Sequence, residues 1–207
     1  MTYAPPILRW GCAALTLFVA GILSASVSPQ VRVNRIVFDR IGNDDGWRAR
    51  IELSATGVTP SSDTATVRKS RFLDDLVCSL RLSFESVHQP FVFFESHVEI
   101  ISLEQGETYT LDFYLPGEVV RRDQLSTEPF AYLLSFEVAG NPQAFVPRWA
   151  SSNLQSPTAR EALIQHCAAV REQQLGILVP SYHAPPEYTL RERVNRPPFR
   201  RIPVTTP

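Results

Sequence analysis

The sequence predicts an all-β fold, an antiparallel β-sandwich followed by a helix and a tail. The first observation is that segments 109–115 and 130–138 carry the clearest period-two patterns of the chain. Successive side chains on a strand point to opposite faces, so each segment offers one apolar face to a core. The second observation is that six such segments follow one another with no helical pattern between them. This order excludes the alternating strands and helices of a parallel sheet.

Turn residues separate the six predicted strands. These strands cover residues 31–38, 47–55, 76–86, 91–102, 109–115 and 130–138. Segments of this length with turn signals between them are typical of an immunoglobulin-like sandwich, which we predict over residues 31–148. The paired cysteines and buried tryptophan of antibody domains are not present in their usual arrangement. The prediction therefore rests on the number and spacing of the strands.

Two connections stand out between the predicted strands. Residues 56–75 are polar and lack periodicity, and a loop of this length is typical of a mobile segment or a binding loop. Between the fifth and sixth strands, Pro116 and Pro129 bracket a stretch that predicts one short helical turn.

An amphipathic helix is predicted over residues 157–175. Leu163, Cys167 and Val170 recur on one face at helical spacing, and charged residues occupy the other face. Gly176 ends the pattern, as glycine commonly does just after a helix. We expect the apolar face of this helix to pack on the sandwich.

Residues 183–207 form an extended basic tail by composition. They hold six Pro and five Arg against two Glu, which leaves little apolar surface to order the segment. Only residues 188–194 alternate well enough to join a sheet edge. Arg191 and Arg193 lie in that stretch and are candidates for binding an acidic partner surface. We expect the tail to be mobile alone and ordered on a partner; an idle tail is the competing interpretation.

The first 25 residues have the pattern of a secretory signal peptide. Arg9 precedes an apolar run over residues 10–23, and small residues follow near the expected cleavage site. An uncleaved anchor is the alternative, although the run is shorter than the roughly 20 residues that span a bilayer. Cleavage would leave no stable membrane span and a periplasmic or extracellular protein.

Cys78 and Cys167 remain after such cleavage. Both lie on apolar faces, Cys78 in a predicted strand and Cys167 in the predicted helix. In an oxidising compartment an even pair is compatible with one disulfide that ties the helix to the sandwich. The alternative is two small core residues that never meet.

No pattern of a catalytic or metal site is visible. The chain lacks a nucleophile elbow, a phosphate-binding loop and metal-binding His or Cys spacings, so we assign no catalytic residue, metal or cofactor and predict no enzymatic activity. A formal net charge of −1 gives no electrostatic footprint for nucleic acid.

Three further positions are candidates for an interaction surface. Arg121 and Arg122 lie in the polar connection before the sixth strand, where a solvated turn is the plainer interpretation. Phe93 lies in the most aromatic strand. It would serve a carbohydrate- or surface-binding module of the envelope, which is the alternative function.

The run FYLPGEVVRRDQL followed by EPFAYLLSFEV resembles part of a known group of proteins. Together with the expected signal peptide and the strand led by Trp47, it resembles small secreted immunoglobulin-like proteins. These are encoded with type IV pilus assembly genes in some Gram-negative bacteria. The resemblance covers residues 31–140. It implies an immunoglobulin-like fold, no enzymatic activity, and a periplasmic or pilus-associated place. We predict that the chain binds other proteins of a cell-envelope or pilus assembly, because no catalytic set converges and exposed strand edges can accept another strand. It does not indicate an oligomeric state, and the chain lacks the N-terminal helix of a pilin subunit.

Overall fold

The computed structural model describes six stretches of the chain. These stretches are residues 30–41, 46–56, 71–126, 128–174, 176–184 and 194–200. The expected signal peptide (1–25), residues 57–70 of the polar loop, and Arg191 and Arg193 lie outside the described residues.

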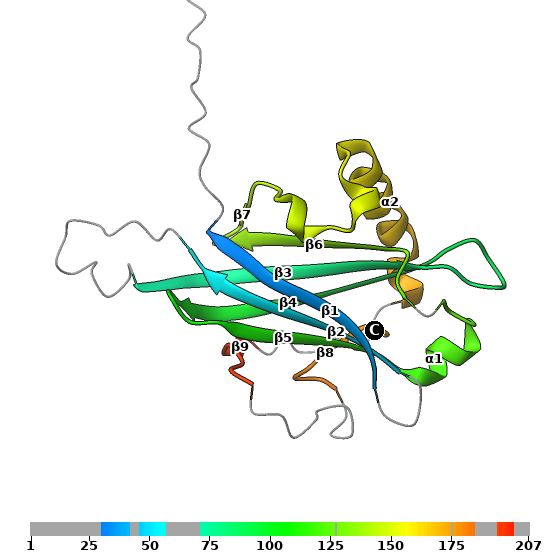
Figure 1. Ribbon diagram of the computed structural model, residues 1–207, viewed down its shortest axis with the longest axis horizontal. Helices are drawn as coiled ribbons and strands as arrows, with labels where there is room; N and C mark the ends of the chain where they lie inside the picture. Colours follow the sequence, from blue (N-terminus) through cyan, green and yellow to red (C-terminus); the bar gives the residue numbers. More distant parts are fainter. Residues whose placement is uncertain are drawn as a thin grey trace, which may run out of the picture.

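Two antiparallel sheets pack face to face (Figure 1). The first sheet has the strand order β1-β2-β5-β8, and the second has the order β7-β6-β3-β4-β9. The strands are β1 (Val31–Ile41), β2 (Gly46–Ala55), β3 (Phe72–Phe84), β4 (Val92–Glu104), β5 (Tyr109–Leu115), β6 (Ala131–Val138), β7 (Asn141–Pro142), β8 (Val179–Pro180) and β9 (Phe199–Arg200). This arrangement confirms the all-β antiparallel sandwich that the alternation predicts.

The core lies between the two sheets and is built by the predicted apolar faces. Ile51 and Leu53 of β2 face Leu80 of β3 and Phe136 of β6 across the sandwich, and all four are at most 1% exposed. Inward side chains at every second position remove one face of each sheet from water, which is the main favourable contribution to folding.

Strand β3 begins earlier than the alternation indicates. It starts at Phe72 rather than at Leu76, because Leu73 pairs with Leu103 and is buried. The pairing with β4 is interrupted at Asp75, which has a positive φ of 52°. This irregularity breaks the period-two pattern and makes the start of the strand look like part of the polar loop.

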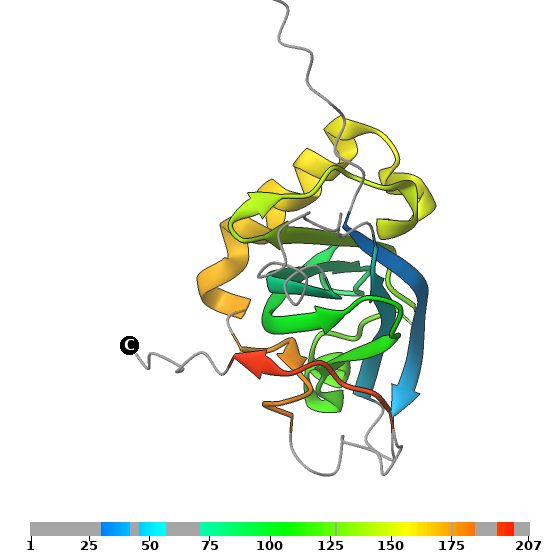
Figure 2. The same ribbon diagram turned by 90° about the vertical axis from the view of Figure 1, so that its left-hand side faces the viewer.

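A helix covers the outer face of the second sheet. Helix α2 (Pro157–Gln174) lies on the outer face of this sheet, mainly against β4, and buries Leu163 and Cys167 (Figures 1 and 2). Its apolar face packs against Ala131 and Leu133 of β6 in a second, smaller core. Two short 3₁₀ helices, Pro147–Trp149 and Ser152–Leu154, lead the chain from β7 to this helix.

The two cysteines lie on opposite faces of the second sheet. Cys78 of β3 points into the core between the sheets, whereas Cys167 of α2 packs on the outer face, where its thiol donates to the carbonyl of Phe94 at 3.8 Å. Both thiols are free. Of the two alternatives, the structure therefore has two core cysteines that do not meet rather than a disulfide, because the sheet itself separates the two sulfur atoms.

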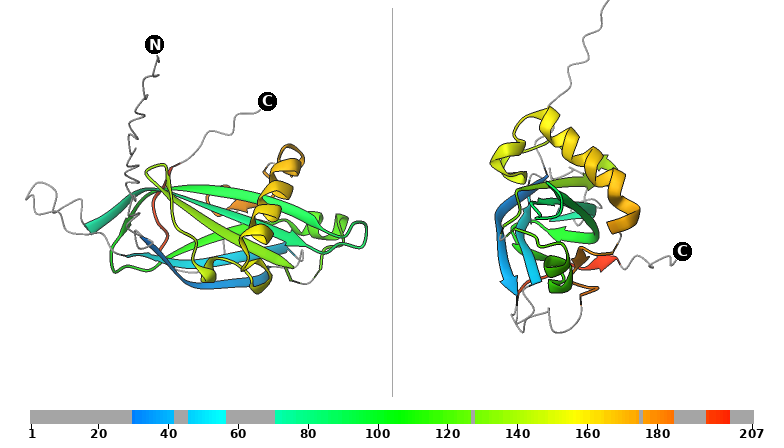
Figure 3. Two further views of the ribbon diagram at one scale, coloured as in Figure 1. Left: turned by 90° about the horizontal axis from the view of Figure 1, so that it is seen from above. Right: turned by 90° about the vertical axis from the view of Figure 1, so that its right-hand side faces the viewer.

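The end of the chain closes one side of the sandwich. β8 extends the first sheet by pairing with β5, and β9 extends the second sheet by pairing with β4. Between them, the carbonyl of Asn195 accepts a hydrogen bond from the backbone N–H of Thr110 at 2.8 Å. The expectation of a tail that orders only on a partner is thus wrong for residues 194–200. In the right-hand view of Figure 3, β8 and β9 lie on the opposite side of the sandwich from β1 and β2.

Candidate functional site

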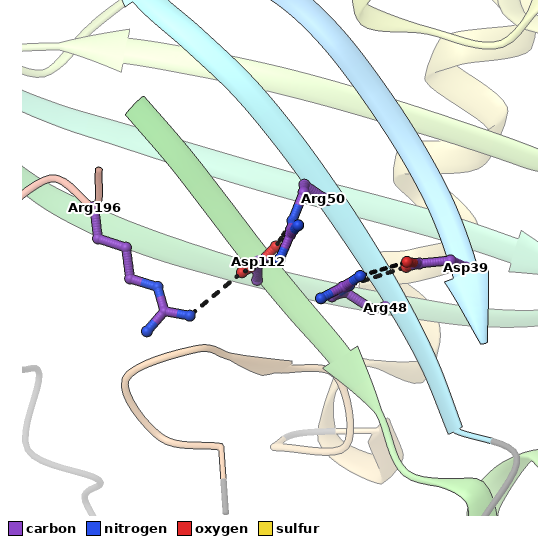
Figure 4. Close-up of polar contacts among 5 residues, drawn as sticks. All are labelled: Asp39, Arg48, Arg50, Asp112 and Arg196. Atoms are coloured by element: carbon purple, nitrogen blue, oxygen red, sulfur yellow. Dashed lines mark hydrogen bonds and ion pairs between the residues drawn. The ribbon is translucent and has the colours of Figure 1, made fainter. Parts of the chain in front are cut away.

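A network of charged side chains crosses the outer face of the first sheet (Figure 4). Arg48 and Arg50 are two residues apart on β2 and therefore point to the same face. Strand register places Asp39 of β1 opposite Arg48, and Asp112 of β5 opposite Arg50. Arg196, from the C-terminal segment, reaches the same carboxylate. We call these five residues the arginine ladder.

The contacts within the ladder are paired and partly bidentate. Arg50 donates from Nε to Oδ1 of Asp112 at 2.8 Å and from Nη2 to Oδ2 at 3.4 Å. Nη2 of Arg196 lies 3.6 Å from Oδ2 of the same carboxylate. Arg48 donates from Nε to Oδ1 of Asp39 at 3.0 Å and from Nη2 to Oδ2. Such fork-shaped pairs are strong and fix the orientation of both partners.

Burial decides what the ladder can do. The side chain of Asp112 is 0% exposed and that of Arg48 is 7% exposed. The hydrogen bond with Asp39 raises the pKa of Arg48 above its ordinary value and outweighs the opposing effect of burial. The carboxylate of Asp112 is surrounded by guanidinium groups that cannot accept a proton, so the ladder has no general acid–base pair. It acts as an anchor that joins β1, β2, β5 and the C-terminal segment.

A second polar cluster lies under α2 on the outer face of the second sheet. Glu95 of β4 pairs with Arg81 at 2.6 Å and with Arg171 of α2 at 3.3 Å. His97 and Cys167 line a cavity of about 40 Å³ beside this carboxylate. Burial, with Glu95 adding to it, raises the pKa of the Cys167 thiol to about 12. A thiol that stays protonated at neutral pH is a poor nucleophile, so the cluster is a packing contact.

Metal ligands do not converge in the described part of the chain. Across the described residues, no group of three or more His, Cys, Asp and Glu side chains is placed to hold a metal ion. Among the same residues, no helix has both the length and the apolar character needed to cross a membrane.

The interaction candidates chosen from the sequence do not come together. Arg121 and Arg122 lie in the last turn of α1 (Gly117–Arg122), where Arg122 forms a bidentate pair with Asp123 at 2.7 Å. Phe93 is half-buried and stacks on His166 of α2, with ring centroids 4.9 Å apart. Phe93 is therefore part of the helix–sheet contact, and its ring is partly covered by that of His166.

Strand β1 forms an edge of the first sheet, and two of its inward side chains are only partly covered. Among the described residues, β1 has β2 as its one strand partner. Its inward side chains Ile36 and Phe38 are only half-buried, in contrast to Ile51 of β2, which is 0% exposed. The ring of Phe38 meets that of Tyr132 on β6 at 5.2 Å and so bridges the two sheets at this side.

A groove runs beside the first residues of β1. It has a volume of about 450 Å³ and is bounded by Val31, Val33, Val146 and Trp149, with the exposed arginines Arg32 and Arg148 at its rim. We call β1 together with Val146, Arg148 and Trp149 the open edge. It combines unpaired strand backbone, half-buried apolar side chains and positive charge.

Sequence reasoning missed both the ladder and the open edge. Arg48, Arg50 and Asp112 occupy the polar faces of predicted strands, and a single strand pattern does not show which strands are neighbours. The sequence did show arginines on the strand of residues 47–55, and aspartates on or beside strands that precede and follow it in the chain. Arg32 and Arg35 on the first strand were likewise visible, but their exposure depends on β1 being an edge strand.

Comparisons with known proteins concern the fold only. No protein-family model and no curated protein matches this chain. A crystal structure of a protein from Akkermansia muciniphila is similar, with a TM-score of 0.58 and 12% sequence identity. The match covers 84% of this chain and 94% of that chain. At this identity the likeness shows that the two proteins have a similar fold, and it says nothing about a shared activity.

Proposed function

We propose that this chain is a non-enzymatic, secreted, immunoglobulin-like protein that binds other proteins of a cell-envelope or type IV pilus assembly. The observation that carries the proposal is the open edge, because exposed strand edges bind partner chains by adding a strand. The buried and mutually paired charges of the ladder support a binding role over a catalytic one. The signal-peptide pattern of residues 1–25 supports secretion.

The order of the strands supports the immunoglobulin-like assignment. In that fold, strands A, B and E are neighbours in one sheet, and C, F and G are neighbours in the other. If β1, β2 and β5 correspond to A, B and E, then β3, β6 and β7 correspond to C, F and G, and their neighbours agree. β4 then matches the additional strand that variable-type domains attach to the second sheet beside strand C.

Site-specific cross-linking in growing cells of the native organism tests the proposed function. A photo-reactive amino acid replaces Arg35 on the open edge in one strain, and Glu161, which is exposed on α2, in a matched control strain. We expect adducts from position 35 with a protein of the envelope or pilus assembly, identified by mass spectrometry. No adduct at position 35, or equal adducts at both positions, would count against the proposal.

Secretion is tested separately on the same cells. Mass spectrometry of the chain recovered from the envelope fraction is expected to show an N-terminus near Ser26. An intact Met1 in the membrane fraction would contradict cleavage and indicate an anchored protein instead.

A further inference from the structure

We propose that the open edge binds an extended, acidic segment of the partner protein, which pairs with residues 35–39 of β1 as an added strand. This inference rests on the proposed function and specifies the chemistry of the partner. Three properties of the open edge carry it, namely its backbone register, its half-buried apolar side chains and its charge.

Backbone register makes the second half of β1 suitable for strand addition. Residues 35–39 pair with β2 in unbroken register, whereas an irregularity interrupts the pairing between Val33 and Arg35. An edge strand presents every second N–H and C=O group away from its neighbour, so this stretch offers a regular row of donors and acceptors. A partner strand can satisfy these groups without any change in the sandwich.

Half-buried side chains give an added strand apolar surface to cover. Ile36 and Phe38 point toward the core but are only partly covered, as is Tyr132 across the gap. Burial raises the pKa of Tyr132, so its phenol stays neutral when a partner covers it. A strand beside β1 would place alternate side chains over these three residues. Removing this apolar area from water favours binding.

Charge selects the kind of segment that binds. Arg32, Arg35 and Arg148 are exposed, and none of them has an ion-pair partner among the described residues. Among the described residues of β1 and β2, the carboxylates are Glu52, which is the cross-strand neighbour of Arg35, and Asp39, which Arg48 already pairs. The surplus of positive charge is complementary to an acidic peptide.

The same charges disfavour other occupants of the edge. β1 carries three arginines against one carboxylate, Asp39, which Arg48 already pairs, so pairing of β1 with β1 of a second copy would bring together two strands of net positive charge. The chain's own residues 1–29 contain no Asp or Glu, so they lack the charge that the edge attracts. The occupant that fits the open edge is therefore an acidic segment of a separate protein.

Peptide binding to the full chain tests the proposal. The probe is a synthetic ten-residue peptide that alternates Glu with Val and Thr, and its matched control carries Lys in place of Glu. Binding is measured by fluorescence polarisation at low and at physiological salt, and hydrogen exchange locates the protected amides. We expect the Glu peptide to bind with protection of residues 35–39, and the Lys peptide not to bind.

Two variants separate charge recognition from loss of fold. The double variant Arg35→Glu/Arg148→Glu is expected to weaken binding of the Glu peptide about tenfold, at roughly 0.7 kcal/mol for each reversed surface charge. Arg122→Glu, on α1 outside the open edge, is expected to bind as the unmodified chain does. Circular dichroism and thermal unfolding confirm that both variants are folded.

Each other outcome overturns the proposal. Binding without protection of β1, or equal binding of the Lys peptide, would show that the open edge does not select an acidic strand. Concentration-dependent dimerisation with protection of β1 would assign the edge to a second copy. If cross-linking from position 35 still captures an assembly protein while the Glu peptide does not bind, the function stands and this inference falls. If both experiments fail, the proposed function falls as well.

Discussion

The two sides of the sandwich are finished in different ways. On one side the C-terminal segment adds β8 to the first sheet and β9 to the second, and every residue of the adjacent strand β5 is buried. On the other side β1 ends the first sheet, and its inward side chains Ile36 and Phe38 stay half-buried. One side is thus completed by the chain itself, while the other keeps surface for a separate strand.

The two sides of the sandwich are protected from unwanted strand pairing in different ways. The closed side uses pairing and the ladder, since Asp112 of β5 holds Arg196 of the covering segment. The open side uses the protections typical of natural edge strands, namely an irregularity between Val33 and Arg35 and outward arginines. These protections limit indiscriminate pairing and still leave residues 35–39 regular.

The largest expected effect comes from breaking the anchor of the closed side. Asp112→Ala leaves the guanidinium groups of Arg50 and Arg196 without their shared carboxylate in a buried site. Removing one partner of a buried ion pair typically costs about 3 to 5 kcal/mol, and we expect a loss of that size in the free energy of unfolding. Urea denaturation measures it. Asp75→Asn is the control, because its pair with Arg200 is exposed and contributes at most about 1 kcal/mol, and asparagine tolerates the positive φ of 52° at this position. Equal losses in the two variants would show that the ladder is no anchor.

A pair of phenylalanine variants compares the packing of the two sides directly. Phe113 of β5 is 0% exposed, whereas Phe38 of β1 is half-buried. We expect Phe113→Ala to cost about 3 to 5 kcal/mol, the usual range for a buried phenylalanine, and Phe38→Ala to cost about half as much. Denaturation of both variants under one set of conditions gives the difference. A loss for Phe38→Ala as large as that for Phe113→Ala would mean that the open edge is already closed.

Local patterns predicted the faces of the strands but not what covers them. The alternation in residues 109–115 correctly assigns Leu111 and Phe113 to the core. It places Asp112 on the opposite face but does not show that this side chain is 0% exposed, because burial there depends on Arg196 from the other end of the chain. A pattern within one strand has no access to contacts between residues so far apart in sequence.

The proline content of the tail was misleading for a physical reason. Proline cannot donate a backbone hydrogen bond, which argues against a central strand. A segment added at a sheet edge, however, can pair through its carbonyl groups alone. The carbonyl of Pro198 accepts a hydrogen bond from the N–H of Ile101 at 2.8 Å, and Pro197 is buried. Composition therefore predicted disorder where residues 194–200 in fact complete a sheet.

A smaller effect is expected from loosening the closed side at its last strand. Phe199 of β9 is half-buried and packs on Tyr182, with ring centroids 5.1 Å apart. Phe199→Ala removes part of this contact, and we expect a loss of about 1 to 2 kcal/mol in the free energy of unfolding. Limited proteolysis is expected to cleave the variant within residues 194–200 faster than the unmodified chain. Val87→Ala, at a side chain that is 78% exposed, is the control and should change neither measurement.

The smallest expected effect tests whether the open side belongs to the fold or to a partner. Arg35 is exposed on β1 and has no ion-pair partner among the described residues, so it contributes little to the isolated chain. We expect Arg35→Ala to change the free energy of unfolding by at most about 0.5 kcal/mol, as is usual for surface substitutions. Arg50→Ala, on the neighbouring strand β2, leaves Asp112 with Arg196 as its remaining partner within the ladder. We expect its loss in the free energy of unfolding to be several times larger. If Arg35→Ala costs as much as Arg50→Ala, the charge on β1 serves stability, and the contrast between a closed side and an open side fails.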